Sequence, residues 1–288
     1  MNDDEIARRK GLTFAQAEGA EPLPTQLKRT EISRQLRAAL WAYIYGELQD
    51  TAERDTWTYV GDPWRTVLKN VHVYLFHAPA DEFDTRFKDA AEAVKAVFMQ
   101  GDYVLIYGWL QDVLRSRAIP DFDRRIDAIL KYCRSAYRVV APDVIAPVGS
   151  DQEAETVGKA LSDLNSAGLT GSREHLKAAA AELSAGHFAD SVRESIQAVE
   201  SVVRVLETDG DFSKALAKLE AKTNMHGALK KGFLAIYGFT SDEQGIRHAL
   251  LDKGAPDVDE ADALFMIGAC SAFVSYLINK ARLTGLLK

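Results

Sequence analysis

The sequence predicts a mainly α-helical protein, in which an N-terminal helical domain with a short β-hairpin precedes a C-terminal helix bundle. Apolar residues recur at steps of three and four along most of the chain, which is the spacing of one helix face. No proline interrupts residues 148–255, so long helices are allowed there. The single β-rich patch is residues 137–147, where Ala141-Pro142-Asp143 supplies the turn between two short strands.

Composition and charge exclude several classes of protein. The chain has 288 residues, of which 47% are hydrophobic and 27% charged, as in ordinary soluble domains. Its net charge of −7 argues against a broad nucleic-acid-binding surface, which needs clustered Lys and Arg, but leaves room for a small local RNA site. No apolar run approaches the roughly 20 residues that span a bilayer, so no membrane segment is expected.

Cysteine usage and the chain's first residues point to the cytoplasm. Cys133 and Cys270 are far apart and have no His or Cys neighbours at metal spacing, which predicts a reduced protein without structural zinc. The acidic start, Met1 to Glu5, is followed by no apolar core, so no signal peptide is expected.

The N-terminal domain is expected to cover residues 1–165. Its first thirty residues are interpreted as an arm or a loosely packed strap. Asp62-Pro63 is typical of a helix start, and Ser150 to Glu153 has the pattern of a capping box. All four tryptophans lie before residue 110, which predicts a bulky aromatic core. Helices are expected over residues 31–48, 64–76, 85–99, 102–114, 121–135 and 150–165, and residues 165–171 are the expected linker.

The C-terminal domain is expected to cover residues 172–288. A capping box at Asp257 to Glu260 predicts the start of its last helix, which is apolar nearly all round. Such a helix is either the central member of a bundle or one side of a dimer interface. Helices are expected over residues 172–184, 187–208, 212–221, 227–237 and 258–280.

The helix over residues 187–208 carries a polar row beside its buried apolar stripe. The row is Arg193, Gln197, Glu200 and Arg204, at steps of four, three and four. One interpretation is a set of intrahelical pairs, each worth a few tenths of a kcal/mol. The other is one wall of a polar cleft.

Arg247 and His248 are the strongest chemical signal in the chain. They set a permanent cation beside a group that titrates near neutral pH, and phosphodiester cleavage needs both: a proton carrier, and a fixed charge for the developing negative oxygens. The plainer interpretation is that Arg247 pairs with a carboxylate on a neighbouring helix while His248 fills a half-buried slot.

Three C-terminal blocks carry a family resemblance. Residues 186–200, which begin Gly-His-Phe-Ala-Asp-Ser-Val-Arg, residues 237–248 and residues 269–277 resemble HEPN-type domains of AbiJ-like abortive-infection proteins. Upstream, residues 38–41 and the hairpin at 137–147 look like the N-terminal domain found fused to such modules. The resemblance covers most of the chain from about residue 14 and is specific in the C-terminal blocks.

The resemblance implies a helical domain that dimerises and cleaves RNA without a metal, the substrate's own 2′-hydroxyl attacking the adjacent phosphorus. Its usual signature is an Arg, then a polar residue, then a His five to seven residues after the Arg. Arg247 and His248 match the first two positions. The last His should stand five to seven residues after Arg247, but those positions hold Asp252, Lys253 and Gly254.

Two function classes therefore stay open. The first is a metal-independent endoribonuclease serving as a toxin or phage-defence effector, with Arg247, His248 and Glu200 as catalytic residues and Arg193 and Arg204 binding substrate. The second is a non-catalytic module that binds RNA or a nucleotide. Both need no cofactor or metal and imply RNA, a second copy of the chain and an antitoxin as partners. A helical-repeat scaffold for proteins is disfavoured because no repeat period occurs.

Overall fold

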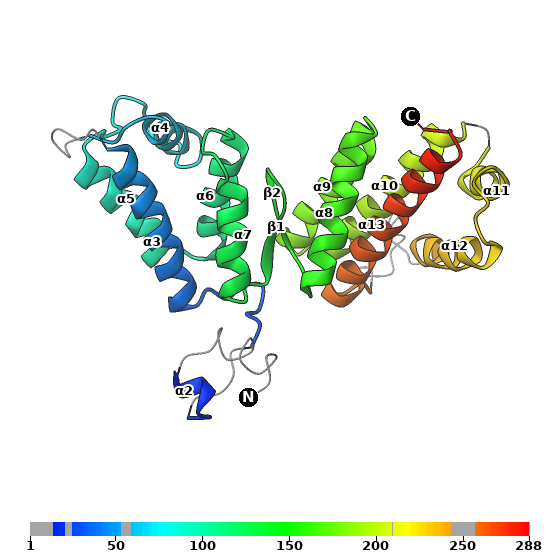
Figure 1. Cartoon of the computed structure of the whole chain (residues 1–288), viewed down its shortest axis with the longest axis horizontal. Helices are drawn as coiled ribbons and strands as arrows, with labels where there is room; N and C mark the ends of the chain where they lie inside the picture. The colour runs from blue at the N-terminus through cyan, green and yellow to red at the C-terminus, as the bar shows by residue number, and fades with distance from the viewer. Residues whose placement is uncertain (1–13, 21–24, 53–58, 209, 243–256, 288) are drawn as a thin grey trace, which may run out of the picture. The chain divides into compact units, whose positions relative to one another are not determined.

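The computed structural model describes residues 14–20, 25–52, 59–208, 210–242 and 257–287. Over these residues the chain forms twelve α-helices and one two-stranded antiparallel hairpin, which confirms the mainly α-helical fold (Figure 1). Contacts divide the chain into two compact units, Met1–Asp143 and Val144–Lys288. The division falls in the turn of the hairpin.

The first unit is a helical assembly whose elements lie close to the expected ranges. The short helix α2 belongs to the segment expected to be an arm, and the Leu27 N–H that follows it donates to Arg134 O at 2.9 Å, as a strap would. Six helices and one strand are described: α2 (Phe14–Ala17), α3 (Arg34–Thr51), α4 (Trp64–Tyr74), α5 (Phe87–Gln100), α6 (Tyr103–Ser116), α7 (Phe122–Tyr132) and β1 (Tyr137–Ala141).

The core of this unit is aromatic. Trp64 and Trp109 stack with ring centroids 6.2 Å apart, and both are almost fully buried. Phe98 meets Trp109 edge to face at 5.1 Å, and Phe122 meets Trp64 in the same way at 5.9 Å. Stacked and edge-to-face rings stabilise a core beyond the area that they bury. The predicted aromatic core is therefore confirmed.

The hairpin is supported by helices on both strands. β1 packs against α7, and β2 (Val144–Pro147) packs against α9. On the α7 side, Arg138 Nε and Nη2 donate to the two carboxylate oxygens of Asp127, each at 2.7 Å. The Val139 N–H donates to the same carboxylate at 3.0 Å, so the strand is tied to the helix by side chain and backbone together.

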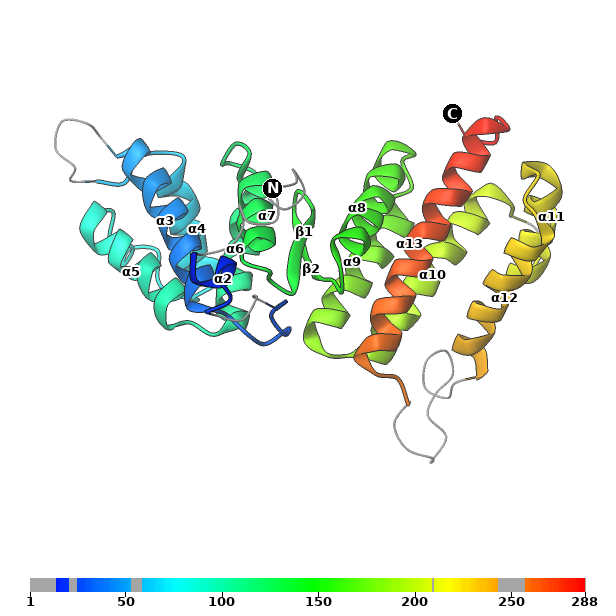
Figure 2. The same ribbon diagram turned by 60° about the horizontal axis from the view of Figure 1, so that its bottom comes forward.

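The second unit contains the predicted helix bundle. Figure 2 shows α8, α9, α10 and α13 side by side, with α11 and α12 beyond α10. Its six helices are α8 (Asp151–Ser166), α9 (Thr170–Ala185), α10 (Phe188–Leu206), α11 (Phe212–Thr223), α12 (Gly227–Asp242) and α13 (Glu260–Leu283). The sequence places α8 in the N-terminal domain, whereas in the structure α8 packs against α13 and α9.

Helix α13 is the apolar helix anticipated near the C-terminus. It packs against α8, α9, α10 and α11, and its deepest side chains, Val274, Leu277 and Ile278, have no exposed area. By length and composition α13 alone, among the described helices, is long and apolar enough to cross a membrane. However, more than half of its apolar stretch is buried inside the protein, as expected of the core helix of a bundle.

Two predicted helix caps are wrong in detail. The capping box of α13 is made by Asp259 and Asp262, two residues after the predicted start at Asp257. At α8 the Ser150 hydroxyl accepts from the Glu153 N–H at 3.1 Å as expected, but Glu153 accepts from the Gly149 N–H, one residue before the cap. Several acidic or hydroxyl residues near a helix start can each act as cap, so the pattern fixes the cap only to within a turn.

Candidate functional site

The two residues with the strongest chemical signal, Arg247 and His248, fall within residues 243–256 and so lie outside the described residues. The expected catalytic group of Arg247, His248 and Glu200 therefore stays a prediction, and of its members the structure describes Glu200. The neighbouring helices are described: α12 ends at Asp242 and α13 begins at Glu260. In Figure 2 these two helix ends and the first turns of α10 lie toward the same end of the bundle.

Helix α10 displays the predicted polar row along one side. Arg193, Gln197 and Glu200 are half-buried, and Arg204 is exposed. The adjoining side carries the apolar stripe, of which Val192, Ile196, Val199 and Val203 are almost fully buried. The amphipathic reading of this helix is confirmed.

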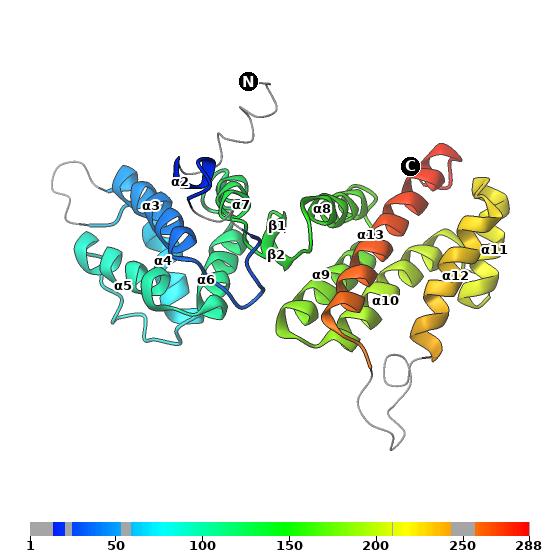
Figure 3. The ribbon, with the colours of Figure 1, turned by 90° about the horizontal axis from the view of Figure 1, so that it is seen from below.

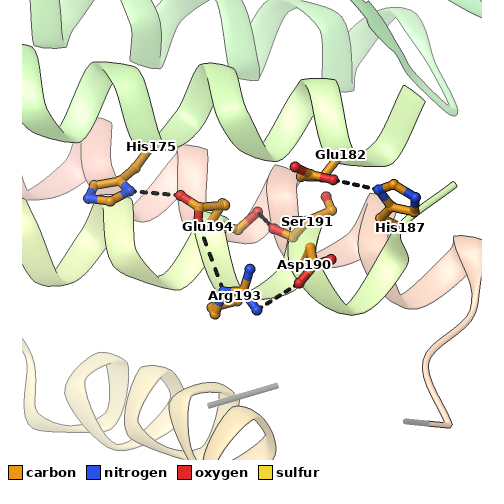
Figure 4. A network of polar contacts seen from close by, with 8 residues as sticks. His175, Glu182, His187, Asp190, Ser191, Arg193 and Glu194 are labelled. Atoms are coloured by element: carbon orange, nitrogen blue, oxygen red, sulfur yellow. Dashed lines mark hydrogen bonds and ion pairs between the residues drawn. The ribbon is translucent and has the colours of Figure 1, made fainter. Parts of the chain in front are cut away.

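Arg193 belongs to a chain of polar contacts that joins α9 to α10 (Figure 4). Its Nη1 lies 2.6 Å from an oxygen of Asp190, and its Nε lies 4.0 Å from Glu194. The other carboxylate oxygen of Glu194 lies 2.8 Å from Nδ1 of His175 on α9. Arg193 therefore makes the intrahelical pairs of the plainer interpretation, although with Asp190 and Glu194 rather than with the next members of the polar row.

The turn between α9 and α10 sets this arrangement. Gly186 ends α9 with φ of 84°, a left-handed conformation that glycine adopts without steric cost, and the His187 N–H closes the turn by donating to Glu182 O at 2.9 Å. The chain then reverses, and the buried Ser191 hydroxyl donates to Ala179 O at 2.8 Å. This register brings His175 opposite Glu194.

A second histidine–carboxylate pair lies at the turn itself. His187 Nδ1 is 2.8 Å from an oxygen of Glu182, and Asp190 is close by on the first turn of α10 (Figure 4). One ligand atom each from Glu182, His187 and Asp190 lie within 4.8 Å of one another, a group that could hold a metal ion. Arg193 already neutralises Asp190, so a cation would have to displace the guanidinium.

The contacts define what this polar cluster, made of His175, Glu182, His187, Asp190, Arg193 and Glu194, can do chemically. Glu194 engages Nδ1 of His175, which leaves Nε2 as the nitrogen that can exchange a proton, and the side chain is 38% exposed, so solvent or substrate can reach it. The one guanidinium of the cluster, that of Arg193, already faces two carboxylates, Asp190 and Glu194. The cluster is therefore better suited to moving protons than to cradling a phosphate.

Sequence reasoning missed His175 and Glu194. Neither belongs to a local motif, because each acquires its partner only when the chain reverses at Gly186. One signal was available: the two residues lie on consecutive predicted helices that are joined by a short turn, 11 residues before and 8 residues after Gly186.

Comparison of the chain with protein-family models, with curated proteins and with solved structures gives no match. Assignment of a function therefore rests on the residues themselves.

Proposed function

We propose that the C-terminal unit is a metal-independent endoribonuclease of the HEPN type that acts in the cytoplasm as a toxin or phage-defence effector. The observation that carries the proposal is the His175–Glu194 pair beside Arg193, with 2.8 Å between the imidazole Nδ1 and the carboxylate. A carboxylate that holds one ring nitrogen of a histidine fixes the tautomer and leaves the other nitrogen as a proton carrier. Cleavage of RNA through its own 2′-hydroxyl needs such a group.

In this reaction the 2′-oxygen loses its proton to His175 Nε2 and forms a bond to the adjacent phosphorus. The bond from phosphorus to the 5′-oxygen breaks, and the leaving oxygen takes the electron pair together with a proton from His248. The products are a 2′,3′-cyclic phosphate and a free 5′-hydroxyl. Arg247 stabilises the charge that develops on the phosphate oxygens, with Glu200 orienting it, and Arg193 and Arg204 bind the flanking chain. His175 thereby takes the role of the final His that the motif lacks at residues 252–254.

A non-catalytic module that binds RNA or a nucleotide is the second candidate. The observation that favours it is that Asp252, Lys253 and Gly254 stand where the motif would place its last His, so the chain lacks one proton carrier of the usual signature. On either reading we propose that two copies associate through the C-terminal unit. A toxin of this kind would also be held in check by an antitoxin.

The test is cleavage of a fluorescent RNA by the purified full chain in the presence of EDTA, with the RNA ends identified. We expect fragments that end in 2′,3′-cyclic phosphate. His175→Gln should slow cleavage by roughly 10²-fold, the usual contribution of one general acid or base. Arg247→Ala should slow it by roughly 10²- to 10³-fold, as loss of one oxyanion donor does.

His187→Gln is the matched control, because it removes the other histidine–glutamate pair of the same polar cluster, also 2.8 Å long. It should cleave like the wild type. Binding of RNA without cleavage by the wild type would select the non-catalytic module. Cleavage that EDTA abolishes would exclude the metal-independent reaction.

A further inference from the structure

The first unit contains a pocket of about 200 Å³ that is lined by residues of α4, α5 and α6 and of the segment between α4 and α5. Figure 3 shows the ribbon of these helices. Its inner wall is formed by buried apolar side chains of α4 and α5 and by the ring of Trp109 on α6. The segment that connects α4 to α5 contributes Phe76 and Phe83 at the entrance. The pocket thus has an aromatic entrance and an apolar interior.

The connecting segment is held in place by several contacts, so the pocket is preformed. His72 Nε2 lies 2.9 Å from Pro79 O, and the His72 ring packs on Phe83 with centroids 5.6 Å apart. The Val60 N–H donates to Thr85 O at 2.9 Å. A site that need not order itself on binding loses less affinity to conformational entropy.

The rim of the pocket is acidic. Glu82, Asp84 and Asp89 line it, and Arg86 pairs with two of them, Asp84 and Asp89. The hydrogen bonds from Arg86 lower the pKa of Asp84 to about 2, so this carboxyl is charged at neutral pH. Three carboxylates against one guanidinium leave the rim with a negative charge, which attracts a cation and repels an anion.

Size and lining together define the class of ligand. An apolar cavity of about 150 Å³ is enough to hold benzene, so 200 Å³ accommodates one ring or a branched alkyl group of that size. Aromatic side chains beside carboxylates are the surroundings in which organic ammonium groups bind, through attraction to the ring faces and to the negative charge. Neither a phosphate nor a nucleotide fits this description.

We infer that the first unit binds a small organic ammonium compound, its ring-sized apolar group in the pocket between α4, α5 and α6 and its cationic group at Glu82, Asp84 and Asp89. This inference is independent of the function proposed for the second unit, because all lining residues belong to the first.

The experiment is calorimetric titration of the full chain with 2-phenylethylammonium, and with phenylacetate and 2-phenylethanol as an anionic and a neutral compound of similar size. We expect one ammonium per chain, with phenylacetate bound at least about 10-fold more weakly and 2-phenylethanol between them, the difference shrinking as salt rises. Glu82→Gln should weaken ammonium binding several-fold. Glu92→Gln, on the exposed side of α5 and outside the pocket lining, is the matched control.

Ala93→Trp tests the location, because Ala93 is an exposed residue of the lining and a large side chain there fills the entrance. Binding should be lost while the melting temperature stays near that of the wild type. Lys95→Trp, exposed on the same helix outside the lining, should bind normally.

If Ala93→Trp does not fold, the comparison of Glu82→Gln with Glu92→Gln decides whether the ammonium binds at this pocket. Equal binding of all three compounds, no binding of the ammonium at millimolar concentration, or wild-type binding by Glu82→Gln would overturn the inference.

Discussion

At the residue scale, the pairing of Arg138 with Asp127 is a contact whose loss should strongly destabilise the protein. The Arg138 side chain is only 9% exposed, and both of its bonds to Asp127 measure 2.7 Å. Replacing Asp127 removes both of these bonds from a guanidinium that is almost buried, which costs about 3 kcal/mol or more. Asp127→Ala should therefore lower the free energy of unfolding by about that amount in urea titrations.

The matched control for this pair is Arg124→Ala on the same helix. Arg124 is 83% exposed and pairs with Asp121 at 3.4 Å, so its loss should change stability by less than about 1 kcal/mol. Similar effects of the two substitutions would show that burial does not strengthen the Arg138 pair.

Asp163 should make stability depend on pH. Burial alone would raise its pKa, but Lys159 at 2.6 Å and Arg282 at 3.7 Å lower it below the usual value. A carboxylate whose pKa is lowered on folding stabilises the protein above its unfolded value, roughly 3.9, and this contribution is lost as pH falls through the folded value. Asp163→Asn should thus destabilise the protein by about 1 kcal/mol at pH 7 and by much less at pH 3.

Thermal unfolding of the wild type and of Asp163→Asn across this range of pH measures the effect. Asp211→Asn is a useful comparison, because Asp211 caps α11 but is exposed. A difference between Asp163→Asn and the wild type that is the same at pH 7 and pH 3 would contradict the assignment of the lowered pKa.

The candidate site could be predicted only in part from single residues. The polar row on α10 followed from its spacing, and the structure places Arg193, Gln197 and Glu200 half-buried along that helix. His175 could not be found in this way, since its carboxylate partner is on another helix. Arg193 was expected to bind phosphate, whereas its nearest partners are Asp190 and Glu194. Spacing along one helix shows which side a residue lies on, and contacts across a turn depend on the register of two helices.

At the element scale, the apolar composition of α13 has two explanations: the helix is the central member of the bundle, or it is one side of a dimer interface. If it is the core helix of the second unit, the buried Leu277 should carry much more of the stability than the apolar residues at its exposed end. Leu277 has no exposed area, and truncation of such a residue to alanine costs about 2 to 5 kcal/mol. Leu283, 82% exposed on the same helix, is the control.

Leu277→Ala and Leu283→Ala are therefore compared by urea unfolding in the absence of detergent or lipid. We expect a large loss of stability for the first and almost none for the second. If both variants unfold like the wild type, α13 is not a core helix and its apolar composition serves another purpose.

Helix positions could be predicted well because apolar periodicity reports the buried face directly. Leu36, Leu40, Ile44 and Leu48 of α3 recur every fourth residue, and all four are fully buried. Helix ends were less certain, as the start of α13 shows: both Asp257 and Asp259 are suitable caps, and the helix begins after Asp259, which accepts from the Asp262 N–H. The choice between them depends on packing, which the local sequence does not contain.

At the scale of the whole molecule, the two units carry different kinds of site. The pocket in the first unit is apolar with an acidic rim, and the polar cluster in the second joins two histidines to carboxylates and an arginine. The sequence predicted two domains but placed the boundary after α8, because Gly168 and Gly171 resemble a linker. In the structure, only Ala167, Gly168 and Leu169 separate α8 from α9, and Leu169 is buried. This connection is therefore a turn within the second unit.

The last prediction concerns assembly of the whole chain. The resemblance to HEPN-type domains and the apolar composition of α13 predict a homodimer, and Phe265, 60% exposed near the start of this helix, is the apolar side chain best suited to reach a second copy. Exposed aromatic residues are costly to leave in water and are enriched at interfaces. Light scattering should thus give twice the mass of one chain at micromolar concentration, and Phe265→Glu should give monomers because a buried carboxylate without a partner opposes association.

The control is Leu283→Glu, at the other end of α13, which should remain a dimer. A monomeric wild type would remove the dimer from the proposed function, and a dimeric Phe265→Glu would place the interface elsewhere.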